Sequence, residues 1–420
     1  MSDELRPRSI RSKKLSTIAR HGRLRRSNPF VTVAKVLAAS LAVLLVSGAS
    51  VAAIATYDVA ASVQDGVPLA NEAESAEFEI DAIPGGVNLL VVGSDSRKGQ
   101  DASFGPVDST GDLNDVTMLL HISEDHTNAS VISFPRDMYV PIPECPDPAG
   151  GTFDSMDSQK INTTLTYGGL ACTVLTVEKL TGLSIPYAAE VQFSGVMAMS
   201  TAVGGVPVCV AEDIEDEYTN TYLPAGMHTL EGLEALQFLR TRHGVGDGSD
   251  LTRISNQQVF LSSLVRTVKS ASTLSDPIKV YSLAKAVTAN MNLSTSLNDV
   301  STLASIAVAL KDIDLSKVVF AQVPTGLVEG GVIPSQPDFD DLFAAVAADD
   351  SLQLAAAPTA EDPTAEDPAA APDPSAETDP AATPAPDPAA TPPAAVLSDS
   401  VKGQTAGDVT CSAGRSLEDQ

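Results

Sequence analysis

Positive charge is scarce in this sequence and is concentrated at one end. The 420 residues carry 26 Lys and Arg against 54 Asp and Glu, a formal net charge of −28 at pH 7. Nine of the cations lie in residues 1–32, beside only two acids. The acidic remainder is not expected to bind nucleic acid, and the short basic segment has no room for a folded DNA-reading domain.

Charge of either sign is absent from residues 36–57, which read VLAASLAVLLVSGASVAAIATY. A helix rises about 1.5 Å per residue, so this run can cross a hydrocarbon layer of roughly 30 Å. We expect a single membrane-spanning helix over 33–57, with the basic tail 1–32 on the cytoplasmic side of the cell membrane and the rest outside. The alternative is a cleaved signal peptide, but the apolar region of such a peptide usually has only about 7 to 15 residues.

Cysteine occurs at only four positions, and no CxxC pair or Cys/His spacing indicates a zinc site. An exported chain with four cysteines fits up to two disulfides. We expect Cys145 to pair with Cys172, because these two bracket one loop-plus-helix segment. Connectivity does not follow from sequence alone, and free buried thiols are the alternative.

Lys and Arg are also missing from residues 318–401, and after about 349 the sequence becomes rich in Ala, Pro, Asp, Glu and Thr. Near-repeats such as PTAEDPTAEDPAAAPDP cannot bury enough apolar surface to become ordered. We therefore expect 346–420 to be a disordered acidic tail, in which Cys411 has a role only if it is tied back to the domain. Residues 58–85 are polar and aperiodic and are expected to form an extracytoplasmic stalk.

Residues 86–345 have the pattern of one folded domain. Short apolar runs bounded by Gly, Asp, Asn and Pro predict buried strands, and they alternate with segments of helical periodicity. The expected strands are 87–92, 116–122, 129–134, 187–193, 206–211 and 317–323, and the expected helices are 171–181, 194–202, 229–241, 253–271 and 300–313. This alternation predicts a layered α/β/α domain with a central mixed sheet.

Four polar clusters lie at strand ends or at the start of a helix. They are GSDSR (93–97), Asp115, the PRD sequence 135–137, and the run RTRHGVGDGSDLTRISNQQ (240–258). Strand ends of layered α/β domains meet in one crevice, where arginines suit phosphate oxygens and carboxylates suit a divalent cation. A single Arg-Asp motif is more often an ion pair, GSDSR lacks the ending of a Walker loop, and a lone loop histidine such as His243 is weak evidence for a base. Together the clusters predict a site for a phosphorylated, Mg²⁺-bound substrate.

In order and spacing, GSDSR, NDVTML, SFPRDMYVPIP, KIN, GGVPVCV and LEGLEALQFLRTRHGVGDGSDLTR resemble the motifs of the LytR-CpsA-Psr family, in its actinobacterial form. The resemblance covers about residues 86–270. It implies an extracytoplasmic phosphotransferase that moves a glycopolymer from a polyprenyl pyrophosphate carrier onto peptidoglycan, typically onto the 6-hydroxyl of N-acetylmuramic acid. A pyrophosphatase side activity is also implied.

The resemblance assigns roles to residues. Asp95 and Asp115 are implied to hold Mg²⁺ or Mn²⁺, and the catalytic set is completed by Arg136 and Asp250, the latter orienting arginines or acting as base. The residues implied to bind pyrophosphate are Arg97, Arg136, Lys160, Arg240, Arg242, Arg253 and Gln257. The chain departs from the family pattern at Thr252, where Gly is usual, and at Asn256, where a second Arg is usual. Loss of that cation is expected to cost about 1.5 to 3 kcal/mol of pyrophosphate affinity if the site is buried.

Three questions stay open from the sequence. The general base is not identified. A lipid groove could involve Val177, Phe193, Met197 and Met199, although their helical spacing favours an ordinary core. Two other functions compete: a non-catalytic adaptor that binds the same lipid-linked polymer, which Asn256 keeps open, and a membrane-bound regulator, which the short tail does not favour. The polymer, the acceptor sugar and the oligomeric state do not follow from the residues.

Overall fold

The structure is a computed structural model that describes residues 29–72, 83, 85–98, 100, 112–147, 149–355 and 394–420. The chain divides into two units, Met1–Tyr57 and Asp58–Gln420. Helix α1 (Pro29–Ala61) begins in the first unit, and from Phe30 onward it is long and apolar enough to cross a membrane, the one such helix among the described residues. This confirms the helix expected over 33–57, while most of the basic tail, residues 1–28, lies outside the described residues.

A mixed sheet of seven strands forms the centre of the second unit, in the order β13-β8-β1-β2-β3-β14-β19. The strands are β1 (Val87–Ser94), β2 (Asn114–Ile122), β3 (Ala129–Phe134), β8 (Tyr187–Val191), β13 (Met291–Leu293), β14 (Val318–Gln322) and β19 (Gly403–Thr405). The pairs β1/β8 and β3/β14 are parallel and the other pairs are antiparallel. The predicted mixed sheet is confirmed.

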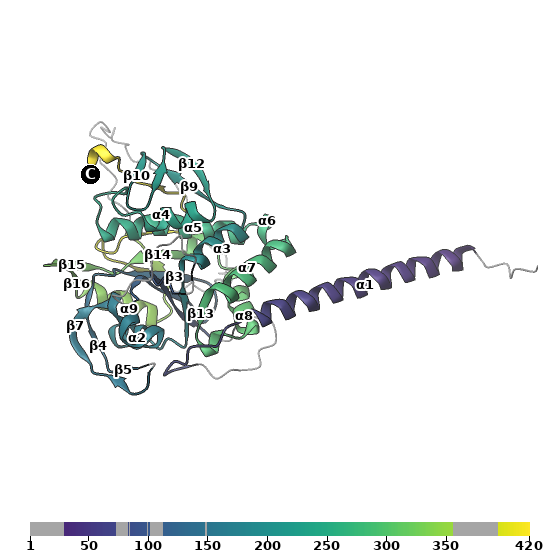
Figure 1. Ribbon diagram of the computed structural model, residues 1–420, viewed down its shortest axis with the longest axis horizontal. Coiled ribbons are helices and arrows are strands. Elements are labelled where there is room, and N and C mark those ends of the chain that lie inside the picture. The colour runs from purple at the N-terminus through teal and green to yellow at the C-terminus, as the bar shows by residue number, and fades with distance from the viewer. Residues whose placement is uncertain are drawn as a thin grey trace, which may run out of the picture. The chain divides into compact units, whose positions relative to one another are not determined.

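Helices cover both faces of this sheet (Figure 1). Side chains of a strand alternate between faces: Leu90 and Val92 of β1 pack with α2 and α9, whereas Leu89 and Val91 pack toward α3, α5 and α8. The helix bounds are α2 (Thr164–Thr181), α3 (Phe193–Ala202), α5 (Asp250–Lys269), α6 (Ala271–Leu274), α7 (Pro277–Asn290), α8 (Val300–Lys311) and α9 (Asp338–Ala347). The layered α/β/α arrangement follows from this two-sided burial.

A second, smaller sheet has the order β12-β9-β20, with β9 (Val206–Val210), β12 (Gly226–Leu230) and β20 (Cys411–Ser412). It packs on α4 (Leu233–Arg240) and α5 through a cluster that includes Val208, Phe238 and Phe260. The prediction of one helix over 229–241 is wrong at its beginning. Residues up to Leu230 pair with β9, and Gly232, at φ 57°, separates the strand from the helix.

The remaining short strands form hairpins and ladders around the main sheet. They are β4 (Tyr139–Ile142) with β7 (Met156–Lys160), β5 (Cys145–Pro146) with β6 (Thr152–Phe153), β10 (Ile214–Asp216) with β11 (Thr221–Leu223), β15 (Thr325–Val328) with β16 (Gly331–Pro334), and β17 (Leu352–Gln353) with β18 (Ala395–Val396). Cys145 on β5 is bonded to Cys172 on α2, as predicted.

The last part of the chain corrects the predicted tail 346–420. Residues 356–393 lie outside the described residues, but residues 394–420 carry β18, β19 and β20. Strand β19 completes the edge of the main sheet beside β14, and Cys411 on β20 is bonded to Cys209 on β9. We refer to residues 403–420 as the C-terminal strap, because they return to the domain after a long low-complexity segment.

Part of the predicted stalk 58–85 also contacts the domain. Val67 pairs with Ser294 in a parallel bridge, and its backbone N–H donates to the Leu293 carbonyl at 2.8 Å. The Ser62 hydroxyl lies 2.7 Å from the Thr288 hydroxyl on α7. The chain is therefore fixed to the domain within a few residues of the end of α1.

Candidate active site

A β-bulge between β1 and β2 places two carboxylates at one end of the sheet. The strands pair residue by residue as far as Gly93 and Val116, and then Ser94 pairs with Asn114, which leaves Asp115 as the extra residue. A bulge re-aims the side chain that it carries. Asp95 directly follows β1. The Leu113 N–H donates to Asp95 Oδ1 at 2.7 Å and holds this side chain in place.

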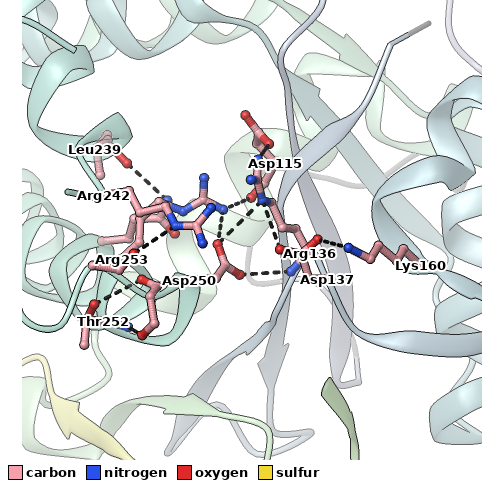
Figure 2. Close-up of polar contacts among 12 residues, drawn as sticks. Asp115, Arg136, Asp137, Lys160, Leu239, Arg242, Asp250, Thr252 and Arg253 are labelled. Carbon is pink, nitrogen blue, oxygen red and sulfur yellow. Dashed lines mark hydrogen bonds and ion pairs between the residues drawn. The ribbon is translucent and has the colours of Figure 1, made fainter. Parts of the chain in front are cut away.

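Arg136 lies in the turn after β3 and meets Asp115 directly. Its Nη1 donates to Asp115 Oδ1 at 2.5 Å, and its backbone N–H donates to Asp250 Oδ2 at 3.2 Å (Figure 2). Burial lowers the pKa of Arg136, but the carboxylates of Asp115 and Asp250 raise it by more, so this side chain stays cationic. The buried strand β3 is thus followed by a guanidinium that Asp115 holds in place.

Helix α5 supplies the other side of the site from its first turn. Ser249 caps this helix through Thr252 N, and an acidic residue such as Asp250 is favoured in a first turn by the exposed backbone N–H groups. Asp250 Oδ1 lies 2.6 Å from Arg253 Nη2, and the same Nη2 donates to the Asp115 carbonyl at 2.8 Å. Asp250 and Arg253 are only 8 % and 5 % exposed, so this ion pair is held inside the protein.

The charged groups line a polar cavity of about 270 Å³. Four arginines reach it, from the turn after β3, the end of α4, the following loop and α5. The residues that line it are Asp115, Arg136, Asp216, Tyr218, Thr219, Arg240, Arg242, His243 and Arg253. Its cationic excess is suited to an anion with several oxygens.

An apolar cavity of about 160 Å³ adjoins the polar one. Its walls come from the strand ends and from α3, α4 and α5, and include Val91, Val116, Met118, Val191, Phe193, Val196, Met199, Leu236, Leu239, Phe260, Leu261 and Leu264. Asp115, Arg240 and Arg253 line both cavities, so the two spaces meet at charged residues. The guanidinium of Arg240 lies 4.6 Å from the centre of the Phe193 ring, at this junction.

Burial changes the pKa of Asp95 and of Arg240, of which Arg240 lies at the junction. It raises the pKa of Asp95, to which the charge of Asp115 adds, against the hydrogen bond from Leu113. Burial also lowers the pKa of Arg240, in part offset by Asp115. The charge of Asp115 thus acts on Asp95, which places the two carboxylates near each other.

Not every residue implied by the sequence lines a cavity. The structure brings Asp115, Arg136, Arg240, Arg242 and Arg253 to the polar cavity and Gln257 to the apolar one. Gln257 also donates to the Leu239 carbonyl at 3.2 Å. Asp95 and Arg97 line neither cavity, although the charge of Arg97 acts on Asp95 and on Arg240.

Lys160 stands apart from both cavities. Its Nζ lies 2.8 Å from Asp137 Oδ1, at the end of β7. Burial raises the pKa of Asp137, but the hydrogen bond from Lys160 and the charge of Arg136 lower it by more, and the net pKa is below the ordinary value. Lys160 therefore acts on the site through Asp137, which adjoins Arg136.

The two departures from the family pattern have structural partners. Asn256 is 3 % exposed, donates to the Phe238 carbonyl at 2.7 Å and accepts a hydrogen bond from Ser412 of the C-terminal strap. The Thr252 hydroxyl donates to the Ser249 carbonyl at 3.0 Å. Asn256 does not line the polar cavity, so the expected loss of a pyrophosphate contact at this position has no geometric support.

Sequence reasoning missed Asp216, Tyr218 and Thr219. Asp216 is fully buried, and its two oxygens accept from five donors: the N–H groups of Tyr218, Thr219, Arg242 and His243 and the Thr241 hydroxyl. Burial raises the pKa of Asp216, but these hydrogen bonds outweigh it and the net pKa is lowered. No motif marks Asp216 in the sequence, because four of its five donors are backbone N–H groups and three of the five lie about 25 residues away.

The described residues contain no group of three or more His, Cys, Asp or Glu side chains arranged to hold a metal by themselves. Asp115 lines the arginine cavity, and Asp95 lies near enough for the charge of Asp115 to act on it. Mg²⁺ is commonly bound by only one or two carboxylates, with waters and substrate phosphates as further ligands. The donor set therefore fits a magnesium ion that binds together with its phosphorylated substrate.

Known proteins are similar to this chain in sequence and in fold. The chain is 29% identical over 325 residues to the cell wall biosynthesis protein LcpA of Corynebacterium glutamicum, covering 69% of this chain and 59% of the relative. It is 29% identical over 290 residues to the Bacillus subtilis polyisoprenyl-teichoic acid–peptidoglycan teichoic acid transferase TagT, covering 67% of this chain and 83% of that protein. The matched region thus spans less than two thirds of the Corynebacterium protein.

A solved structure has a similar fold, that of the LytR-Csp2A-Psr enzyme from Actinomyces oris. The TM-score is 0.50 at 21% sequence identity, with 68% of this chain and 96% of that chain covered. The sequence model of the LytR_cpsA_psr family matches residues 53–343, which include both cavities. The chain belongs to the LytR_cpsA_psr family.

Proposed function

We propose that this protein is a phosphotransferase that moves a glycopolymer from a polyprenyl pyrophosphate carrier onto peptidoglycan and releases polyprenyl phosphate. The observation that carries the proposal is the junction of an apolar cavity with an arginine-lined cavity at Asp115, Arg240 and Arg253. A polyprenyl pyrophosphate has the same two parts, an apolar chain joined directly to a double anion. The name of TagT describes the same class of reaction for that relative.

Substrate binding follows from the lining of the two cavities. The polyprenyl chain would occupy the apolar cavity, beside Phe193 and Met199. These two of the four lipid-groove candidates line it, whereas Val177 belongs to the core of the α2 face and Met197 lines another groove. The pyrophosphate would contact Arg136, Arg240, Arg242 and Arg253. The buried Nε atom of Arg253 makes no hydrogen bond to the described residues, and that of Arg136 has only the carboxylates of Asp137 and Asp250 at 3.6 and 3.7 Å, which supports binding of a further acceptor by these arginines.

Attack of a sugar hydroxyl on phosphorus requires mainly positioning and neutralisation of charge. Arginines held in place before the reaction supply that neutralisation without reorganisation. Asp250 accepts from Arg136 and pairs with Arg253, so its role is to orient these arginines. A side chain this strongly engaged is a poor general base, and Asp95 or Asp115 would take that role only with an oxygen that the metal does not bind.

Asp95 and Asp115 are proposed to hold Mg²⁺, or Mn²⁺ in its place, together with the pyrophosphate. When bound, the ion would neutralise phosphate oxygens as charge moves onto the departing polyprenyl phosphate. Arg136 Nη1 donates to Asp115 Oδ1 at 2.5 Å, so the proposed ion and this guanidinium would share the Asp115 carboxylate. Chelation with EDTA is expected to abolish transfer, and added Mg²⁺ to restore it.

The protein is proposed to be anchored in the cell membrane by α1, with residues 1–32 in the cytoplasm and the domain outside. The basic composition of that segment supports this orientation by the positive-inside rule. Two disulfides, Cys145–Cys172 and Cys209–Cys411, support an oxidising compartment for the domain. The domain would then face the peptidoglycan, its proposed acceptor.

The test uses the full chain in detergent, because truncation near residue 345 would remove β19, β20 and Cys411. The protein is incubated with a polyprenyl pyrophosphate-linked oligosaccharide, peptidoglycan fragments and Mg²⁺, and products are identified by mass spectrometry. Wild type and the surface control Lys179→Ala should attach sugar phosphate to peptidoglycan, and Arg136→Ala and Asp95→Ala should not. Binding of the lipid without transfer or pyrophosphate cleavage in wild type would favour the adaptor function instead.

A further inference from the structure

Tyr218 is an unusual feature of the polar cavity. It lies in the turn between β10 and β11 and lines the cavity together with the arginines, yet it is 82 % exposed. The Tyr218 and His243 rings contact each other, with centroids 4.6 Å apart. A large aromatic side chain is thus presented to solvent at the rim of a charged site.

The backbone that carries the Tyr218 ring is held in position by the buried Asp216. Asp216 Oδ1 accepts from Tyr218 N at 2.9 Å, and Asp216 Oδ2 accepts from His243 N at 3.2 Å and Arg242 N at 3.1 Å. Asn220 closes the turn at φ 54°, a conformation that Asn tolerates better than most residues. One buried carboxylate therefore fixes the backbone of both rings and of Arg242, which lowers the entropy cost of binding against these rings.

The position of Tyr218 relative to the two cavities indicates a ligand. In a polyprenyl pyrophosphate glycoside the groups follow the order lipid, pyrophosphate, sugar. Tyr218 lines the polar cavity and not the apolar one, so a sugar that follows the pyrophosphate away from the lipid can reach it. A sugar ring presents C–H groups to an aromatic face and hydroxyls at its edge, and a tyrosine presents an apolar body with a polar tip.

We propose that Tyr218, supported by His243, is a sugar-binding platform next to the pyrophosphate site. It takes one pyranose ring, either the first sugar of the donor glycopolymer or the acceptor sugar of peptidoglycan. The proposal rests on the proposed function for the identity of the neighbouring anion, and the test below separates the two.

The experiment measures binding to the full chain in detergent with Mg²⁺ by calorimetry, using three probes. Farnesyl pyrophosphate tests the anion site alone, farnesyl pyrophosphoryl-N-acetylglucosamine represents the donor, and chitotetraose represents the acceptor. The variants are Tyr218→Ala, Tyr218→Phe, Arg136→Ala and the matched control Tyr222→Ala. Tyr222 is a half-exposed tyrosine, 52 %, of the neighbouring strand β11 that does not line the polar cavity.

Tyr218→Ala should weaken a sugar-bearing probe about fivefold or more and leave farnesyl pyrophosphate within about twofold of wild type. Tyr218→Phe and Tyr222→Ala should behave as wild type. Loss with the donor probe assigns the platform to the glycopolymer, and loss with chitotetraose alone assigns it to peptidoglycan.

The proposal is overturned if Tyr218→Ala binds both sugar probes as wild type does. It is also overturned if farnesyl pyrophosphate is weakened equally, if Tyr222→Ala has the same effect, or if wild type binds neither sugar probe. Undiminished binding of farnesyl pyrophosphate by Arg136→Ala would instead contradict the proposed anion site, while the sugar probes still decide the role of Tyr218.

Discussion

The two sides of the polar site are held in place by different means. On one side, Asp95, Asp115 and Arg136 follow directly from the ends of β1, β2 and β3, so the sheet itself positions them. On the other side, Arg240, Arg242 and Arg253 come from a helix end, a loop and a new helix. We call these the strand side and the helix side.

The helix side depends on segments far away in the chain. Asp216 binds the backbone of Arg242, and the C-terminal strap braces the same loop: Gly246 N donates to the Ala413 carbonyl at 3.0 Å, and Arg415 N to the Gly244 carbonyl at 2.8 Å. The difference teaches that neighbouring residues of one site can have local or remote support. Substitutions at the remote supports should therefore affect the helix side first.

The largest effect is expected from Arg253→Ala compared with Arg136→Ala. Each should reduce transfer by more than about 100-fold, because each removes a preorganised cation from the phosphate site. Only Arg253→Ala should also unfold easily, since it removes the cation nearest to the buried Asp250, at 2.6 Å, and leaves this carboxylate with Arg136 alone, at a cost of about 3 kcal/mol. Arg136 is half-buried, and its loss should change the unfolding free energy much less.

Transfer assays and urea unfolding of both variants check this prediction. Arg253→Lys is the matched control: it should recover stability more than transfer, because an ammonium can pair with Asp250 but lacks the planar fork of donors that a guanidinium offers to phosphate oxygens. Equal loss of stability in Arg136→Ala and Arg253→Ala would remove the distinction between the two sides.

The next largest effect concerns the two disulfides. Cys209 and Cys411 are separated by 202 residues, and Cys145 and Cys172 by 27. Loop-closure entropy predicts losses of about 5 kcal/mol for Cys209→Ser/Cys411→Ser and about 3.5 kcal/mol for Cys145→Ser/Cys172→Ser. Only the first double variant frees the strap, so only it should weaken farnesyl pyrophosphate binding under conditions where both remain folded. Equal binding by the two would show that the strap does not support the helix side.

A smaller effect is expected for Asp216→Asn. The amide leaves one acceptor oxygen and sets an NH₂ group against N–H donors, so hydrogen bonds to either Tyr218 and Thr219 or Arg242 and His243 are lost. We expect about 2 kcal/mol less stability and about tenfold slower transfer. Asp213→Asn is the control, because Asp213 accepts one exposed hydrogen bond, from Ala225 N. Transfer at the wild-type rate would show that Arg242 is positioned without Asp216.

The sequence predicted the strand side well because its information is local. Apolar runs define β1 to β3, and the polar residues that end them must meet at the edges of neighbouring strands. The Cys145–Cys172 disulfide was predictable for the same reason. The apolar cavity was not, since Phe193 and Met199 have the same helical spacing as core residues.

The helix side could be predicted only in part. The arginines of 240–253 form a recognisable run, but Asp216 meets them through a fold that no local pattern encodes. Composition alone does not separate the C-terminal strap from the acidic tail that precedes it, so the sequence predicts one disordered segment to the C-terminus. Residues 394–420 are too short to show a clear pattern of strands after a low-complexity stretch. Cys411 is the sequence feature that indicates a link to the folded domain.

The smallest effect on ligand binding is expected at Asn256. It separates two interpretations of this residue, as a lost arginine of the site or as a buried contact of the strap. If Asn256 stands where the site needs a second arginine, Asn256→Arg should strengthen pyrophosphate binding. In the structure both ends of the amide are used, by Phe238 and by Ser412 of the strap, and the side chain is buried away from the polar cavity. A guanidinium there would lose these bonds and bury a charge, so we expect about 2 kcal/mol less stability and no gain in affinity for farnesyl pyrophosphate.

Thermal unfolding and calorimetry check both parts, with Ser412→Ala as the control that removes one bond without adding charge. Tighter binding by Asn256→Arg would show that this position faces the anion after all, and that its bond to the strap is expendable.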